Sequence, residues 1–157
     1  MIHNRPLTVY TTNTRRANVY QSAPQDIGQF FERLRSSQAI PFSHDSYMAL
    51  SKGQQDDLKD VGGFVLGELR GGRRKAGAVL SRCAAVLDAD TLGPGETDGV
   101  VRRMEALGCC YCIYSTAKHS PDAPRLRIVI PFSEDINADE YEPVTRLLCQ
   151  MIPPEMT

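Results

Sequence analysis

The chain has 157 residues, enough for one domain with a single core. Hydrophobic residues make up 41% and charged residues 24%, and no apolar run approaches the ~18 residues that a membrane-spanning helix needs. The N-terminus does not resemble a secretory signal, and the five cysteines do not form a disulfide framework. We therefore expect a cytoplasmic protein that does not enter a membrane. A net charge of -1 argues against a protein coated in positive charge.

The first sixty residues predict a short strand and two helices. Residues suited to a strand alternate from Leu7 to Tyr10. An amphipathic helix is predicted where apolar residues recur at helical spacing, at Ile27, Phe30, Phe31 and Leu34. Ser22 followed by Gln25 resembles a capping box at its start. A weaker helix is predicted from Tyr47 to about Lys52, before a polar, acidic loop that ends at Asp60.

Two strands follow. Gly62 and Gly63 lead into a strand at Phe64–Leu66, and Gly71 with Gly72 predicts a flexible turn. The next apolar run predicts a buried strand from about Cys83 to Leu87. Because a turn containing glycine separates Phe64–Leu69 from Val79–Leu87, we expect these two segments to pair antiparallel.

The remaining residues predict helix, strand, strand and helix. Val100, Met104 and Leu107 mark one helix face, which Gly108 closes. The apolar run Cys109–Tyr114 predicts a buried strand, in which we interpret the cysteines as core residues rather than zinc ligands. Alternation predicts a strand at Arg125–Phe132, and a last helix carries its apolar face at Tyr141, Val144, Leu148 and Met151. Pro143 is expected in its first turn and Pro153–Pro154 at its end.

Together these elements predict an α+β fold with a mainly antiparallel sheet. The core would have the RRM-like order strand, helix, strand, strand, helix, packed by helices. We expect a single domain over residues 1–157, with an N-terminal extension at 1–60 and the core at 61–152.

The most informative motif is Asp88-Ala89-Asp90, at the end of the predicted core strand. Residues i and i+2 of a strand point to the same side, so the two carboxylates can face one point in space. Such a pair suits a hard divalent cation, Mg²⁺ or Mn²⁺. The alternative interpretation is a strand that ends in an Asp-rich turn.

A second cluster of polar side chains lies between the last two strands. The segment contains Ser115, Lys118 and His119, and the strand after it begins with Arg125 and Arg127. Histidine and arginine can donate to phosphate oxygens. Beside the carboxylate pair, this cationic loop would suit a nucleoside triphosphate with a bridging metal ion.

Basic residues also gather before the Asp pair. No acidic residue occurs from Leu69 to Leu87, a segment that contains Arg73, Arg74 and Lys75. A solvated face explains such a run as readily as a binding site does.

The ordered set of a basic segment, Asp88-Ala89-Asp90, Ser115-Thr116-Ala117-Lys118-His119 and Pro124-Arg125-Leu126-Arg127 resembles the archaeo-eukaryotic primase superfamily. The closest similarity is to the primase-like N-terminal domain of large phage and plasmid replication proteins related to the virulence-associated E group. This domain often precedes a helicase.

The resemblance implies nucleotidyl transfer, with NTP or dNTP as substrate and DNA as single-stranded template or primer. Asp88 and Asp90 would hold the metal ions, and His119 would be a catalytic residue that contacts phosphate. Ser115, Lys118, Arg125 and Arg127 would bind nucleotide phosphates, and Arg73, Arg74 and Lys75 would touch nucleotide or template. The Ser-to-His spacing is longer here than in the family pattern.

The family also has a third acidic motif, on a strand after the last helix, and this sequence stops before such a strand. The resemblance therefore implies an N-terminal fragment of a longer protein, or a minimal derivative without a complete metal site. Either would bind nucleotide but fail to polymerise by itself.

Three other functions remain open. A haloacid dehalogenase-like phosphatase also uses a strand-end Asp pair, but Thr91 comes one residue too early and that fold needs a parallel sheet. A non-catalytic nucleic-acid-binding module could stack Tyr111 or Tyr114 on bases. A replication-initiator nuclease would need two neighbouring histidines, whereas His3, His44 and His119 lie far apart in the sequence.

Overall fold

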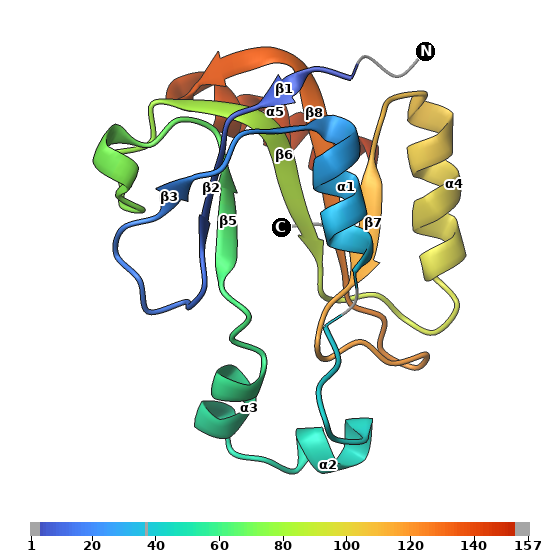
Figure 1. The fold of residues 1–157 in the computed structure, drawn as a ribbon. Coiled ribbons are helices and arrows are strands. Elements are labelled where there is room, and N and C mark those ends of the chain that lie inside the picture. The colour runs from blue at the N-terminus through green and yellow to red at the C-terminus, as the bar shows by residue number, and fades with distance from the viewer. Residues whose placement is uncertain (1–3, 37, 153–157) are drawn as a thin grey trace. The chain divides into compact units, whose positions relative to one another are not determined.

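The structure is a computed structural model that describes residues 4–36 and 38–152. It contains two compact units (Figure 1): an N-terminal unit from Asn4 to Leu80 and a C-terminal unit that begins at Ser81. Helices and antiparallel sheets occur together, so the predicted α+β class is confirmed.

The C-terminal unit follows the predicted order of strand, helix, strand, strand and helix. Its elements are β6 (Ser81–Ala89), α4 (Thr97–Leu107), β7 (Cys112–Ser115), β8 (Leu126–Asn137) and α5 (Ala138–Met151). The three strands form an antiparallel sheet in the order β6-β8-β7. This strand order is compatible with the RRM-like core that the sequence predicts.

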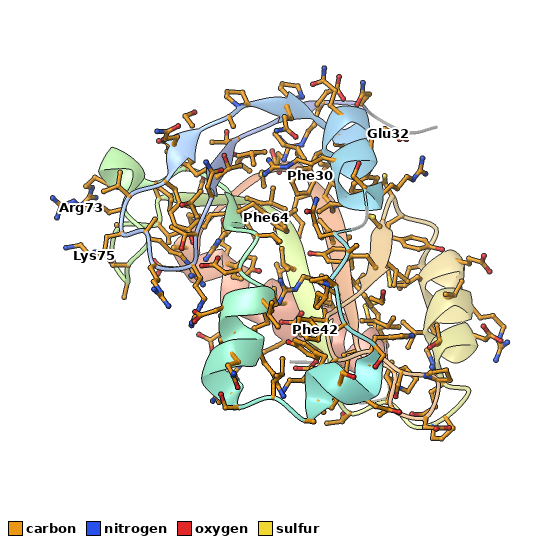
Figure 2. The ribbon with its side chains drawn as sticks, turned by 60° about the horizontal axis from the view of Figure 1, so that its bottom comes forward. Phe30, Glu32, Phe42, Phe64, Arg73 and Lys75 are labelled. Carbon is orange, nitrogen blue, oxygen red and sulfur yellow. The ribbon has the colours of Figure 1, made fainter. Side chains whose placement is uncertain are left out.

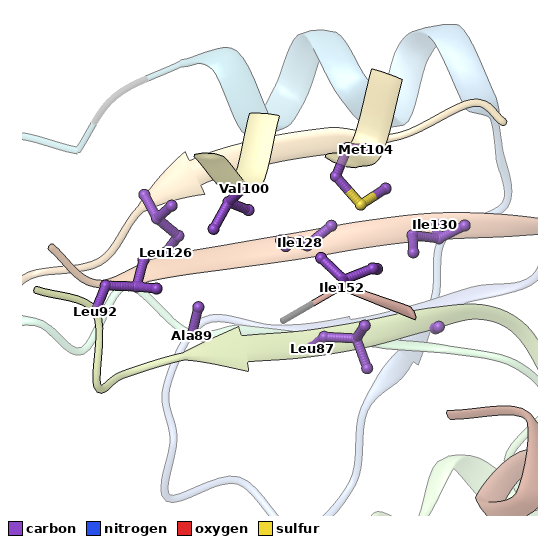
Figure 3. Close-up of a cluster of buried hydrophobic side chains, with 10 residues drawn as sticks. Leu87, Ala89, Leu92, Val100, Met104, Leu126, Ile128, Ile130 and Ile152 are labelled. Carbon is purple, nitrogen blue, oxygen red and sulfur yellow. The ribbon is translucent and has the colours of Figure 1, made fainter. Parts of the chain in front are cut away.

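One face of this sheet forms the core of the unit, because every second strand residue is apolar. Leu87 and Ala89 of β6 and Ile128 of β8 belong to one buried cluster. Val100 and Met104 of α4 and Ile152 after α5 complete it (Figure 3). Both helices therefore cover the same face, and the alternate strand residues, such as Asp88 and Arg127, belong to the other face.

The ends of both helices have clear local causes. Gly108 follows α4 with φ +65°, a left-handed conformation that favours glycine, as the sequence predicts. Asn137 caps α5 and accepts hydrogen bonds from the backbone of Asp139 and Glu140. Since this cap starts α5 at Ala138, Pro143 lies beyond the first turn, and its predicted placement was wrong. Pro153 and Pro154 lie outside the described residues.

The two neighbouring strands differ from the sequence prediction. The strand predicted at Cys109–Tyr114 starts only at Cys112, and Cys109 is exposed while the strand is only half-buried. β8 runs beyond Phe132 to Asn137, past a register shift opposite Arg82 and Ala84 of β6. An apolar run alone could not predict burial here, because β7 is an edge strand.

The N-terminal unit is built from short elements. Its strands are β1 (Pro6–Leu7), β2 (Val9–Thr12), β3 (Gln21–Ser22), β4 (Gln25–Asp26) and β5 (Gly63–Leu66). Its helices are α1 (Ile27–Arg35), α2 (His44–Met48) and α3 (Lys52–Leu58), with a 3₁₀ turn, η1, at Arg70–Gly72. The strands form two antiparallel sheets, β1-β4 and β3-β2-β5.

The predicted antiparallel pairing of Phe64–Leu69 with Val79–Leu87 is present only beside the turn, at Leu69 and Val79, and was wrong for the strands themselves. β5 instead pairs with β2, and β6 pairs with β8. Only an isolated bridge between Leu69 and Val79 and nearby backbone hydrogen bonds join the two segments. Because α1, α2 and α3 separate β2 from β5 in the chain, sequence proximity gave no sign of this partner.

Helix α1 was predicted correctly in position but not in its cap. Asp26, rather than Ser22, accepts the Gln29 N–H at 2.7 Å and forms the capping box with Gln29. The helix packs Phe30 edge-on against Phe64 of β5, with ring centroids 5.1 Å apart (Figure 2).

The polar segment before Asp60 was predicted as a loop, and this was wrong, because it contains α3. Ser51 caps this helix, and only Gln55 of the helix is buried. The Gln55 amide donates to the backbone oxygens of Met48 and Leu50, which fixes α3 to the end of α2. Because the buried residue of α3 is a glutamine, the sequence of this helix shows no apolar periodicity that could predict it.

In the described part of the chain, no helix is both long and apolar enough to cross a bilayer.

Candidate nucleotide and metal site

The predicted metal ligand Asp88 forms a two-point ion pair with Arg127. In the β6-β8 register these residues lie directly opposite each other. The Arg127 Nε donates to one carboxylate oxygen at 2.6 Å and a terminal guanidinium nitrogen donates to the other at 2.9 Å. Hydrogen bonding to Asp88 raises the pKa of Arg127 above its usual value, so the guanidinium stays charged.

Asp90 lies two residues further along and pairs more loosely. Its carboxylate is 3.5 Å from a terminal nitrogen of Arg125, the residue that precedes β8. The Asp90 side chain is 49% exposed, against 34% for Asp88. Of the two carboxylates, Asp90 is therefore more accessible to a ligand from solvent.

Tyr114 of β7 extends this row across the third strand. It lies opposite Arg127 in the β7-β8 register, so both side chains belong to the sheet face that carries Asp88. Burial raises the pKa of Tyr114, while the neighbouring Arg127 guanidinium lowers it to a smaller extent. The sequence suggests Tyr114 only as a base-stacking residue.

The loop between β7 and β8 holds His119 at the same end of the sheet. Thr116 N–H donates to the Arg125 oxygen, and His119 N–H donates to the Thr116 oxygen at 2.9 Å. The imidazole Nδ1 accepts the Arg125 backbone N–H at 3.2 Å. The same Nδ1 is 3.3 Å from the Arg125 backbone oxygen, to which it donates in the other tautomer, and Nε2 makes neither of these contacts.

Ser115 and Lys118 lie near His119 in the chain, but Ser115 belongs to the opposite face of the sheet from Asp88 and Arg127. Ser115 pairs with Leu126 in the β7-β8 register, one position from the Tyr114 and Arg127 pair. Alternation therefore gives Ser115 the face of Leu126 rather than that of Asp88. Lys118 lies in the turn beside His119 and is only partly exposed.

The donor set fits a divalent cation in part. Two carboxylates at one sheet end supply the oxygen ligands that Mg²⁺ and Mn²⁺ prefer. Magnesium commonly binds through one or two carboxylates together with substrate phosphates and water. Among residues 4–36 and 38–152, no group of three or more Asp, Glu, His or Cys side chains is arranged to hold a metal ion. A metal ion here would therefore complete its coordination with oxygen atoms from a ligand or from water.

Arg73, Arg74 and Lys75 belong to the N-terminal unit, in the connection from η1 to β6. They are exposed, and a terminal nitrogen of Arg74 donates to the Tyr20 hydroxyl at 3.5 Å.

Five of the predicted site residues lie together at one end of the sheet formed by β6, β8 and β7. They are Asp88, Asp90, His119, Arg125 and Arg127.

The pairing of Asp88 with Arg127 and the place of Tyr114 were missed. Both depend on β8 lying between β6 and β7, which no local pattern in the sequence reveals. The alternation of Arg125, Leu126, Arg127 and Ile128 was the available signal, because it puts both arginines on one face.

One comparison with known proteins gave a match. The model of the VapE N-terminal domain family matches residues 1–156. Neither the comparison with curated proteins nor the comparison with solved structures found a match.

Proposed function

The chain belongs to the VapE N-terminal domain family, which agrees with its resemblance to the virulence-associated E group, and we propose that it is a primase-like nucleotide-binding domain. It would belong to the archaeo-eukaryotic primase superfamily and serve a replication protein of a phage or other mobile element. Its ligands would be an NTP or dNTP with Mg²⁺ or Mn²⁺. DNA template or primer and a helicase domain would be its partners.

One observation carries the proposal. The carboxylates of Asp88 and Asp90 lie at the same sheet end as the guanidinium groups of Arg125 and Arg127 and the ring of His119. A metal-bound triphosphate carries both charges that such a mixed site needs, because its oxygens attract cations while its metal attracts carboxylates.

The residues would divide these tasks by charge. Asp88 and Asp90 would hold the divalent cation, which would stabilise charge on phosphate oxygens and favour ionisation of an attacking hydroxyl. Arg125 would donate to phosphate through nitrogens not used by Asp90. His119 would donate to phosphate from Nε2, the ring nitrogen that does not contact the Arg125 backbone. Arg127 would share the Asp88 carboxylate with the cation, since it holds both carboxylate oxygens, and its positive charge would weaken binding of the cation.

The antiparallel sheet gives a reason to prefer this function to a haloacid dehalogenase-like phosphatase. That class places its Asp pair on a parallel sheet, whereas β6, β7 and β8 are antiparallel. A non-catalytic nucleic-acid-binding module is the remaining alternative, and it differs from our proposal in needing no metal ion.

A double substitution tests the proposal. Asp88→Asn with Asp90→Asn should abolish Mn²⁺-dependent ATP binding in calorimetric titration, because neutral amides are poor ligands for a hard cation. Asp90→Asn alone should weaken it strongly, and the fold should not depend on this exposed side chain.

The matched control changes two exposed acidic residues of α4, Asp98→Asn with Glu105→Gln, and should bind like the wild type. Thermal unfolding of each variant verifies the fold. Unchanged Mn²⁺-dependent affinity in the folded double variant would refute the metal assignment.

A further inference from the structure

The proposed metal ligands and the proposed phosphate ligands are paired with each other in the structure. Asp88 accepts two hydrogen bonds from Arg127, at 2.6 and 2.9 Å, and Asp90 lies 3.5 Å from a terminal nitrogen of Arg125. The four side chains therefore carry two negative and two positive charges that are matched pair by pair. A divalent cation meets carboxylates that already have cationic partners, and a phosphate meets guanidinium groups that already have anionic partners.

Both ion pairs follow from the register between β6 and β8. Asp88 lies directly opposite Arg127. Asp90 and Arg125 lie two residues further along, each just beyond the end of its strand. Because side chains alternate along a strand, the two pairs are neighbours on one face of the sheet.

All four side chains are partly accessible to solvent, with exposed fractions between 34% and 49%. Ion pairs of this exposure contribute little to the stability of a fold, so their partners can be exchanged while the sheet stays intact. Tyr114, directly opposite Arg127 on β7, provides a second polar neighbour for the guanidinium. Arg127 therefore has a contact on β7 that does not depend on Asp88.

A metal-bound triphosphate offers a replacement partner to every member of both pairs. The guanidinium fork binds two oxygens of a phosphate as it binds two oxygens of a carboxylate. The carboxylates released in this way are oxygen ligands for the divalent cation. A cation alone would leave the guanidinium groups beside a second positive charge, and a triphosphate alone would leave its oxygens beside the carboxylates.

We propose that the two ion pairs make binding of the cation and binding of the triphosphate depend on each other. The guanidinium of Arg127 moves from Asp88 to a phosphate oxygen when both ligands enter, and the loosely paired Arg125 does the same from Asp90. The inference rests on the proposed function and adds its regulation: the site selects the metal-bound triphosphate over the free cation and over the free triphosphate.

The coupling has a simple thermodynamic origin. Separation of the pairs is needed for the cation to reach the carboxylates, and also for the phosphates to reach the guanidinium groups. When both ligands bind, one separation serves both, so each ligand raises the affinity of the site for the other.

The partner of Arg127 can be observed by NMR through its Nε–H group, which donates to Asp88 at 2.6 Å. The proton and nitrogen signal of this group is assigned by its absence in Arg127→Lys. Mg²⁺ replaces Mn²⁺ because it is not paramagnetic. ATP with Mg²⁺ should shift the signal, whereas the same concentration of Mg²⁺ alone, or of ATP in chelator, should leave it in place.

The same spectra separate this proposal from the proposed function. Shifts of backbone amide signals in β6 and β8 on addition of ATP with Mg²⁺, with the Arg127 signal unchanged, would overturn the exchange and leave the nucleotide site intact. An equal shift of the Arg127 signal with Mg²⁺ alone would overturn the coupling. Absence of any shift with ATP and Mg²⁺ would overturn both.

Calorimetric titration of Arg127→Met gives an independent test, because the proposal predicts two effects of opposite sign. Binding of Mn²⁺ alone should become stronger, since Asp88 has lost a competing cation. Binding of ATP in Mn²⁺ should become several-fold weaker, since a phosphate has lost a guanidinium partner. Arg127→Lys should restore part of the ATP affinity, because an ammonium group still attracts phosphate.

The matched control is Arg146→Met, which removes an exposed arginine and its ion pair with Glu142 on α5. Both affinities should stay near those of the wild type. Thermal unfolding verifies the fold of each variant. A change of the same sign in both affinities of folded Arg127→Met would overturn the proposal, because a general loss of charge or of structure would have that effect.

Discussion

Two cations would compete for the carboxylate of Asp88, namely the guanidinium of Arg127 and the metal ion of the proposed function. The first contact is a two-point hydrogen-bonded pair across β6 and β8. A carboxylate has about four lone-pair sites, so it can accept both N–H groups and still ligate a metal ion. The guanidinium charge, however, lowers the attraction of Asp88 for a second cation.

Arg127→Met should therefore strengthen Mn²⁺ binding in the absence of nucleotide, by roughly tenfold or about 1.4 kcal/mol. The same change should lower the free energy of unfolding by about 1 kcal/mol, since it removes a partly exposed ion pair. Manganese titration and urea unfolding measure the two effects. Arg146→Met, which breaks the exposed pair with Glu142, is the control. Unchanged Mn²⁺ affinity in Arg127→Met would argue against Asp88 as a ligand.

His119→Ala should weaken binding of ATP more than binding of AMP, because Nε2 is proposed to donate to the triphosphate. Loss of a hydrogen bond to a charged group costs about 1.5–3 kcal/mol, so ATP affinity should fall by roughly tenfold or more. Competition titrations in Mn²⁺ measure both ligands, with the exposed His44→Ala as control. Equal losses for ATP and AMP would remove the phosphate role.

Tyr114 gives a test of the site by pH. Since burial raises its pKa in the fold, the unfolded chain loses the phenolic proton first, above about pH 10. The stability that this raised pKa contributes is complete below about pH 10. It is lost as pH rises through the pKa of Tyr114 in the folded protein. Tyr114→Phe should therefore lose less stability than the wild type between about pH 9 and pH 11. Urea unfolding across this range measures it, and parallel curves would contradict burial of the hydroxyl.

At this scale the sequence allows candidate residues to be named, but not their contacts. Asp88, Asp90 and His119 could be proposed because strand ends and residue types are visible in the sequence. The Asp88 partner could not, because it depends on the register between two strands that lie far apart in the chain. The sheet face that carries the Ser115 side chain was unpredictable for the same reason, because a shift of one residue in the register between β7 and β8 would reverse it.

Elements with apolar periodicity and a clear end signal were predicted well. Helix α4 is an example, with Val100 and Met104 on its buried face and Gly108 after its last turn. Helix α3 was missed because its capping box and buried Gln55 leave a polar sequence. The pairing of β5 was mistaken because glycine-rich turns suggest hairpins, whereas the connection at residues 70–78 closes with only an isolated bridge.

The cap of α1 can be tested as a property of this element. Asp26→Ala should lower the free energy of unfolding by about 1 kcal/mol, because the Gln29 N–H loses its acceptor. Ser22→Ala is the control, and it should have little effect since Ser22 is exposed in β3. Urea unfolding measures both variants. A larger destabilisation in Ser22→Ala would favour the cap that the sequence pattern predicts.

For the whole molecule, the α+β class was predictable from the order of elements. The sequence predicts a core from residue 61, and the structure contains a C-terminal unit that begins at Ser81. The reason is the pairing of β5 with β2, which joins residues 63–66 to the N-terminal unit. The family match covers both units in one continuous span.

The charge of the whole chain also explains why binding must depend on local sites. A net charge of -1 gives no general attraction to phosphate, so affinity for polyanions has to come from local clusters of cations. Likewise, a triphosphate would bind at the Asp pair only where arginines and a metal ion offset the carboxylates.

Calorimetric titration of this chain with ATP and dATP, once with Mn²⁺ and once with chelator, tests the proposed nucleotide site. We predict binding of both triphosphates with Mn²⁺, and loss of that binding in chelator. Binding of equal affinity in chelator, or no binding with Mn²⁺, would contradict a metal-dependent nucleotide site at Asp88 and Asp90.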